Sequence, residues 1–161
     1  MKRKCEKIIN FGKLKKLTSF TLGSDNTKNC VEALKVVAKH FKEQIDDLLH
    51  KVQTKDNLEN LLINSPCIVI SEDDKGTNYH VAIEKELINN GTTDFVSAFQ
   101  QCYAMYYICN MQYPKSLSCT FEFVQRYYMK THPDQGTKSK IFSASKKKVI
   151  ALMKKLTENE G

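Results

Sequence analysis

Six cysteines and four histidines are the side chains of this chain that could support nucleophilic catalysis or metal binding. A catalytic cysteine needs a histidine base close by and a partly open, electropositive site. The best pairing is Cys109 or Cys119 with His132, but both cysteines fall on apolar stripes of expected helices. A zinc ion could take Cys102, Cys109, Cys119 and His132 as ligands, yet structural zinc sites usually draw ligand pairs about two to four residues apart. We therefore expect no catalytic residue, no metal and no cofactor.

Acidic residues offer the remaining catalytic chemistry. Glu72, Asp73 and Asp74 could gather a divalent cation in a polar loop, and Glu84 with Glu86 could form a carboxylate pair. The first set lacks the EF-hand pattern, and the second fits the solvent face of a strand. The sequence also contains no glycine-rich phosphate loop, GxSxG elbow or HExxH motif. It predicts a protein that is not an enzyme.

Lysines are concentrated at the two ends of the chain. The net charge of +7 divides into +6 for residues 1–22, −4 for 23–129 and +5 for 130–161. Basic ends of this kind commonly contact nucleic acid or other acidic partners, although they also serve simply as solvated termini. Arginine is the usual reader of base edges, and the chain has only Arg3 and Arg126, so any binding of DNA or RNA should be nonspecific. The candidate phosphate-binding residues are Lys2, Arg3, Lys4, Lys13, Lys15, Lys16, Lys138, Lys140, Lys146, Lys147 and Lys148.

Length and composition indicate one domain inside the cell. With 161 residues, of which 41% are apolar, the chain is long enough to bury a core. No stretch is apolar for long enough to span a membrane or to act as a signal peptide. The cysteines show no paired spacing, which favours a reducing compartment. We expect the nucleus or the cytoplasm.

One amphipathic helix is predicted near the N-terminus. Its apolar residues recur at steps of three and four, which places them on one side of an α-helix. They are Val31, Leu34, Ala38, Phe41, Ile45, Leu48 and Val52. This stripe could pack inside the domain, or it could form a homodimer through Leu34, Phe41, Ile45 and Leu48.

The remaining pattern predicts a β-hairpin followed by a helical layer of about three helices. A buried strand at 67–70 and a half-buried strand at 81–87 form the hairpin, with a long acidic loop at 72–78. The other expected elements are a short helix at 58–62, helices at 95–109, 117–129 and 143–156, and a turn at 132–136. Thr92 or Thr93 should cap the first of the three long helices. This gives a single α+β domain at 29–156, between a basic tail at 1–28 and a short tail at 157–161.

An aromatic-rich block carries a family resemblance. Residues 98–114 read AFQQCYAMYYICNMQYP, residues 120–128 read TFEFVQRYY, and residues 132–138 read HPDQGTK. With the strand after Pro66, these pieces resemble the C-terminal module of uncharacterised animal proteins that contain a sterile alpha motif or are associated with transposons. The resemblance covers about residues 65–140. It implies an architecture and a link to interaction or mobile-element domains, and no catalytic residues.

These observations leave three hypotheses. The first is a non-enzymatic interaction or assembly module related to transposon-associated proteins, with an unidentified protein partner or a second copy of the chain. The second is an accessory protein that binds nucleic acid nonspecifically through its basic ends. The third, a cysteine- or metal-dependent enzyme, has the least support in the residues.

Overall fold

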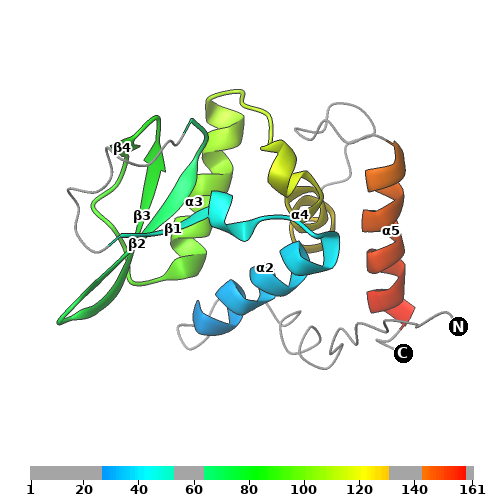
Figure 1. The fold of residues 1–161 in the computed structure, drawn as a ribbon, viewed down its shortest axis with the longest axis horizontal. Coiled ribbons are helices and arrows are strands. Elements are labelled where there is room, and N and C mark those ends of the chain that lie inside the picture. Colours follow the sequence, from blue (N-terminus) through cyan, green and yellow to red (C-terminus); the bar gives the residue numbers. More distant parts are fainter. Residues whose placement is uncertain (1–26, 53–63, 131–142, 159–161) are drawn as a thin grey trace, which may run out of the picture.

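The computed structural model describes residues 27–52, 64–130 and 143–158, and it confirms the mixed α+β class. Helices and strands follow in the order α2 (Thr27–Phe41), η2 (Ile45–Asp47), β1 (Leu49–Val52), β2 (Cys67–Asp73), β3 (Gly76–Ile83), β4 (Glu86–Leu87), α3 (Phe95–Ile108), η4 (Lys115–Leu117), α4 (Ser118–Phe123), η5 (Val124–Tyr128) and α5 (Ser143–Glu158). The sheet has the strand order β1-β2-β3-β4. Helix α3 packs on β2 and β3, and α2, α4 and α5 extend away from the sheet (Figure 1). Residues 1–26 of the predicted N-terminal tail, the helix at 58–62 and the turn at 132–136 lie outside the described residues. The last two residues of that tail, 27–28, belong to α2, and residues 157–158 of the predicted C-terminal tail belong to α5.

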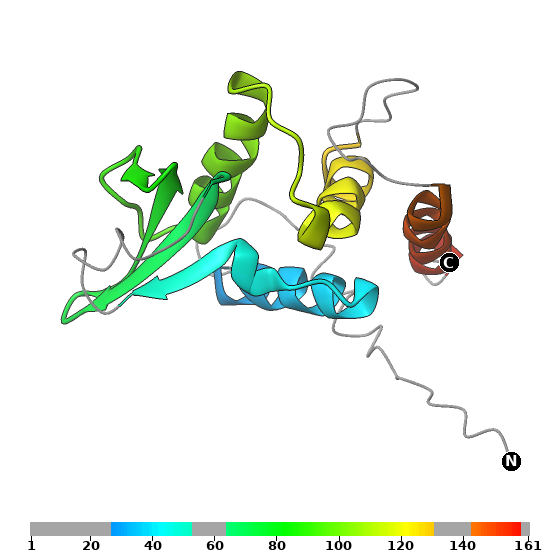
Figure 2. The ribbon, with the colours of Figure 1, turned by 45° about the horizontal axis from the view of Figure 1, so that its top comes forward.

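The amphipathic helix is shorter than its periodicity predicts. Helix α2 ends at Phe41, and Lys42 adopts a left-handed conformation with a φ of 60°. The chain then reverses and runs back toward the sheet as β1 (Figure 2), which pairs in parallel with β2. The prediction of a continuous helix through Val52 is therefore wrong. The apolar residues after Phe41 keep a helical spacing, but spacing is only a weak preference. Pairing of β1 with β2 stabilises the extended conformation more strongly.

The hairpin is present, but its loop is short. Strands β2 and β3 pair antiparallel out to Asp73 and Gly76, so that two residues form the turn in place of the predicted long acidic loop. The Asp73 carboxylate accepts a hydrogen bond from the Lys75 backbone N–H at 2.9 Å, and Gly76 has a φ of 126°, a conformation that favours glycine. Glu84 lies in a second turn with a φ of 50°, and only Glu86 of the predicted carboxylate pair lies in a strand.

Helix α3 begins after an aspartate cap. The Asp94 carboxylate accepts hydrogen bonds from the backbone N–H groups of Val96 at 3.2 Å and Ser97 at 3.0 Å. Neither predicted cap, Thr92 or Thr93, is the N-cap residue, and Thr92 instead accepts a hydrogen bond from the Asp94 N–H at 3.1 Å. Aspartate is at least as favourable as threonine at an N-cap. Asp94 takes this role because it directly precedes Phe95, the first residue of the helix.

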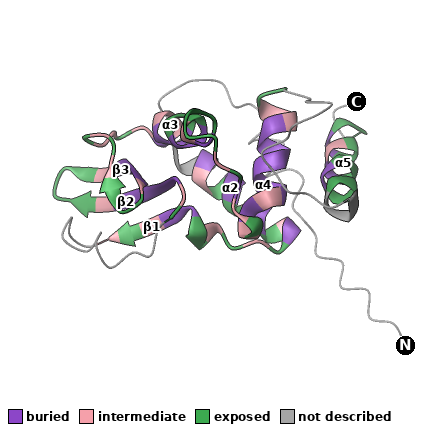
Figure 3. Cartoon of the chain, turned by 90° about the horizontal axis from the view of Figure 1, so that it is seen from above, coloured by how far each residue is buried: buried purple, intermediate pink, exposed green. Residues whose placement is uncertain are grey.

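Two apolar clusters hold the elements together. The first joins the sheet to α2, α3 and α4 through residues that include Ile68, Val81, Phe95, Tyr106 and Phe121. The second joins α2 and α4 to α5 through Val37, Phe123, Val149, Leu152 and Leu156. Buried residues run the length of α4, which lies between the other helices (Figure 3). Helix α4 therefore contributes residues to both clusters, Phe121 to the first and Phe123 to the second.

A distant carboxylate caps the N-terminus of α4. Glu43 lies just after α2 and accepts hydrogen bonds from the backbone N–H groups of Cys119 at 2.7 Å and Thr120 at 2.8 Å. It also accepts a hydrogen bond from the Thr120 hydroxyl at 2.7 Å. The residue at the N-cap position, Leu117, has no side-chain acceptor. Glu43 thus supplies the cap that the local sequence lacks and fixes α4 against α2.

Replacing Glu43 with alanine should lower the free energy of unfolding by roughly 2 kcal/mol, because the change removes charge-assisted hydrogen bonds to a helix N-terminus. Urea denaturation measures the loss. Glu32→Ala is the matched control, since Glu32 pairs with Lys35 at the exposed surface and such pairs contribute little. Equal effects of the two substitutions would contradict the role of Glu43.

Candidate functional site

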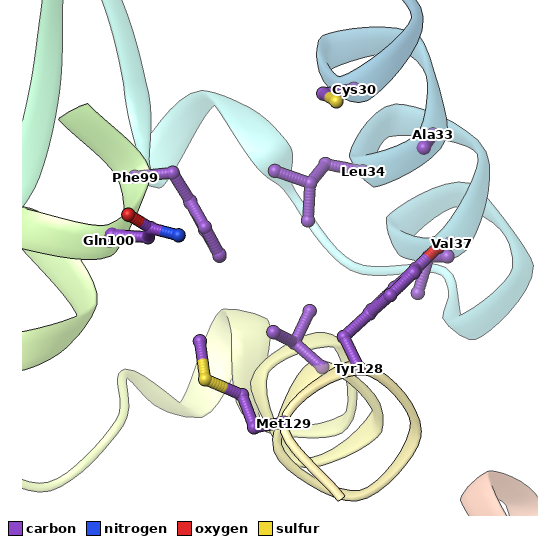
Figure 4. Close-up of a pocket in the computed structure, with 9 residues that line it drawn as sticks. Cys30, Ala33, Leu34, Val37, Phe99, Gln100, Tyr128 and Met129 are labelled. Carbon is purple, nitrogen blue, oxygen red and sulfur yellow. The ribbon is translucent and has the colours of Figure 1, made fainter. Parts of the chain in front are cut away.

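An apolar cavity lies between α2, α3 and η5. Its volume is about 130 Å³. In Figure 4 the labelled side chains reach it from all three elements, with α2 on one side and Phe99 of α3 facing Tyr128 and Met129. The lining consists of Cys30, Ala33, Leu34, Val37, Phe99, Gln100, Val124, Tyr128 and Met129. The cavity is close in size to apolar cavities of roughly 150 Å³ that exclude water and accept a benzene-sized group.

Small side chains on α2 make room for the cavity. Cys30 and Ala33 are one helical turn apart, and both are buried. Larger residues at these positions would fill the space between α2 and Phe99. Neither residue was predicted to line a binding site. The signal in the sequence was the presence of two small residues, a cysteine and an alanine, on the apolar side of an expected helix.

The opposite wall is a π-helical turn. The Met129 N–H donates to the Val124 carbonyl at 3.1 Å, which is the five-residue hydrogen bond of a π-helix. In an α-helix Met129 would be rotated by about 140° from Val124. The wider turn brings both residues to the cavity. Turns of this kind are rare and recur at functional sites.

A hydroxyl cluster ties this wall to α3. The Tyr113 hydroxyl donates to the Tyr103 hydroxyl at 2.7 Å and lies 3.3 Å from the Gln125 side-chain oxygen. The Tyr107 hydroxyl lies 3.2 Å from that of Tyr103 and 3.0 Å from that of Tyr113. Burial raises the pKa of Tyr103 and of Tyr113 well above the usual value, so these phenols stay neutral. Gln125 belongs to η5, and the cluster therefore fixes the π-turn.

The polar groups at the cavity are uncharged at neutral pH. Burial, and to a smaller extent the nearby Asp94, raise the pKa of the Cys30 thiol. Burial, followed by the neighbouring Tyr127 and Cys30, raises the pKa of Tyr128. The cavity therefore holds neither a thiolate nor a phenolate. It is suited to bind an apolar group and lacks an activated nucleophile.

Residues predicted for self-association lie inside the fold. Leu34, Phe41 and Leu48 are buried in the two clusters, and Ile45 is half-buried against the first. Of the two readings of the stripe, the structure shows intramolecular packing. Leu34 also lines the cavity.

The predicted phosphate-binding residues divide into two groups. Lys146, Lys147 and Lys148 are exposed on α5, together with Lys154 and Lys155, which the sequence analysis did not select. Val149, Leu152 and Leu156 point into the second cluster, so the lysines occupy the outward side of the helix. The other candidates, Lys2, Arg3, Lys4, Lys13, Lys15, Lys16, Lys138 and Lys140, lie outside the described residues.

The cysteines considered for catalysis or zinc are not brought together. Cys102 and Cys119 are buried, whereas Cys109 is exposed at the end of α3. The prediction that Cys109 lies on an apolar stripe is therefore wrong, because α3 ends at Ile108. Within residues 27–52, 64–130 and 143–158, no three His, Cys, Asp or Glu side chains are grouped to hold a metal ion. His132 lies outside these ranges.

Comparison of the chain with protein-family models, with curated proteins and with solved structures finds no match. The resemblance to the transposon-associated module stays a prediction from the sequence. Among the described helices, none has the length and apolarity that crossing a membrane requires.

The rate of thiol labelling should follow the burial of each cysteine. In the native protein a maleimide should modify Cys109 rapidly, while Cys67 and Cys102 should stay protected until the protein unfolds. Both are fully buried, and burial raises the pKa of Cys67 to about 12. Peptide mass mapping after timed quenching distinguishes the three sites. Labelling of Cys102 as fast as that of Cys109 would show an open, activated thiol and would revive the enzyme hypothesis.

Proposed function

We propose that the chain is a non-enzymatic interaction module that accepts one large apolar side chain of a protein partner in the α2–α3–η5 cavity. The volume of the cavity supports this most directly. Pockets for cofactors and metabolites are usually about 300–1,000 Å³ and carry several polar groups that orient the ligand. This cavity is smaller and almost entirely apolar, and it suits a single anchoring side chain.

The rim of the cavity is adapted to a protein surface. Met129 is 40% exposed and Gln100 is exposed, so both can contact a group that enters between them. Methionine adjusts its shape readily and is common at binding surfaces. We propose a nuclear or cytoplasmic location. The five described cysteines are all free thiols, which supports a reducing compartment. The resemblance to a module found beside interaction domains points to the same class of function.

Toluene, the hydrocarbon of a phenylalanine side chain, tests the cavity without a known partner. It should raise the free energy of unfolding by about 1.4 kcal/mol when its free concentration is ten times its Kd. Ala33→Leu should abolish this increase, because the longer side chain fills the cavity. Ala151→Leu, on the exposed side of α5, should leave the increase unchanged.

Thermal or urea denaturation with and without toluene gives these values. An Ala33→Leu protein that folds and still gains stability from toluene would contradict the proposal. So would a wild-type protein that toluene does not stabilise.

The lysines of α5 favour a second candidate function, nonspecific binding of nucleic acid. Lys147 and Lys154 are separated by about 10 Å along the helix axis, at 1.5 Å per residue. Helix α5 carries five exposed lysines, and Glu158 is the acidic residue among its described side chains. These lysines can neutralise several phosphates. The second cluster holds this helix against α4, so its charges are presented on a fixed surface.

Replacing Lys146, Lys147, Lys148, Lys154 and Lys155 with glutamine should weaken binding to random-sequence duplex DNA and RNA. It should also reduce the slope of log K against log salt by about 0.9 for each lost phosphate contact. Fluorescence anisotropy at two salt concentrations measures both. The control replaces five exposed lysines elsewhere, Lys35, Lys42, Lys75, Lys115 and Lys130. Equal loss in the two variants, or no binding at low salt, would remove this function.

A further inference from the structure

Strand β1 leaves backbone groups facing outward. Among the strands within residues 27–52, 64–130 and 143–158 it is the terminal strand of the sheet, and the Ile68 N–H donates to the Leu48 carbonyl at 2.8 Å. Backbone groups of successive strand residues point to opposite sides, so His50 also faces β2 while Leu49 and Lys51 face away from it. An edge of this kind is a template for a further strand.

A groove lies on one face of the sheet and reaches this edge. Its volume is about 410 Å³, and residues of β1, β2 and β3 form one side of it while α2 and η2 form the other. Leu49 and Lys51 of β1 line it, which places both side chains on the same side of the sheet as α2. Its apolar surface comes from Val31, Ile45, Leu49, Ile70 and Tyr79. A strand added to β1 would place every second side chain on this face, next to Leu49 and Lys51 at the margin of the groove.

Charged residues form the rim of the groove. Lys35 pairs with Glu32 at 2.9 Å, and Lys51 pairs with Glu72 at 3.3 Å. Asp46 also lines the groove, is exposed, and forms no ion pair with another described residue. The rim therefore carries an excess of one negative charge, which favours a cationic group on whatever enters.

We infer that β1 accepts an extended segment of a protein partner as a fifth strand. The segment has apolar residues at alternate positions and a lysine or arginine placed to meet Asp46. Backbone hydrogen bonds to Leu49 and Lys51 supply affinity, and the groove selects the alternate side chains. This surface lies on the other flank of α2 from the cavity, so the inference does not depend on the proposed function.

A synthetic peptide in which valine and threonine alternate, with lysines at both ends, is the probe. In the full-length protein its binding should slow amide hydrogen exchange at Leu49 and Lys51, whose N–H groups face the open edge. Exchange at His50, whose N–H already faces β2, should change little. Nuclear magnetic resonance resolves the three amides separately.

Two matched comparisons separate strand addition from loose association. A peptide of the same sequence with N-methyl groups on alternate residues keeps its side chains and loses its backbone donors, and it should bind at least tenfold more weakly. Asp46→Lys should weaken binding of the unmethylated peptide several-fold, whereas Asp74→Lys, at the tip of the hairpin turn, should not.

Equal binding of the two peptides would overturn the inference, as would protection that appears at His50 and not at Leu49 and Lys51. Failure of the unmethylated peptide to bind at millimolar concentration would also overturn it. Toluene stabilisation is unaffected by any of these results, so failure here and failure of the cavity proposal are distinguishable.

Discussion

The packing of Phe121 against α3 is the contact on which the arrangement of helices depends. Its ring centroid lies 4.9 Å from that of Tyr113 and 5.1 Å from that of Tyr106, and it also contacts the rings of Tyr103 and Phe99. Aromatic pairs at these separations stabilise a fold beyond the apolar area that they bury. Because α3 covers the sheet and Phe121 belongs to α4, these ring contacts join α4 to the helix that lies on the strand layer. The α2–α3–η5 cavity lies directly beside this junction.

Apolar packing is not directional and does not by itself fix the rotation and position of α4. Polar contacts fix them. Glu122 is buried and pairs with Arg126 one turn later, while Glu43 caps the start of the helix. Glu43 comes from outside the helix, so its contacts penalise alternative positions of α4. The pair with Arg126 lies within α4 and η5, and it keeps the buried Glu122 carboxylate paired. Tyr106 adds a constraint on α3, since its hydroxyl donates to the Pro66 carbonyl at 2.9 Å, where β2 begins. The cavity thus lies between elements that are each fixed by specific polar contacts, which makes it a preformed site.

Local patterns predicted the parts of the fold that local forces decide. The apolar run at Cys67–Ile70 is a strand buried on both faces, and the periodic segments after Phe95 and Ser143 are helices. The helix was predicted to continue through Val52 because Ile45 and Leu48 keep the helical spacing. The spacing gives no information about β2, the parallel partner of β1 that lies further along the chain. The candidate site was less predictable. The π-turn depends on tertiary contacts of Gln125 and Tyr113, and a cavity is a property of three elements together. The exposed lysines at 146–148 were predicted because their charge needs no tertiary context.

The packing around Phe121 leaves a stable apolar cavity beside it, and this cavity should admit an apolar guest. Nuclear Overhauser contacts between bound toluene and the methyl-labelled protein show where such a guest lies. We expect contacts to the methyl groups of Leu34, Val37 and Val124, which line the cavity from α2 and η5. Contacts confined to exposed methyl groups such as those of Ile108 and Ile150, with none to these three residues, would contradict it.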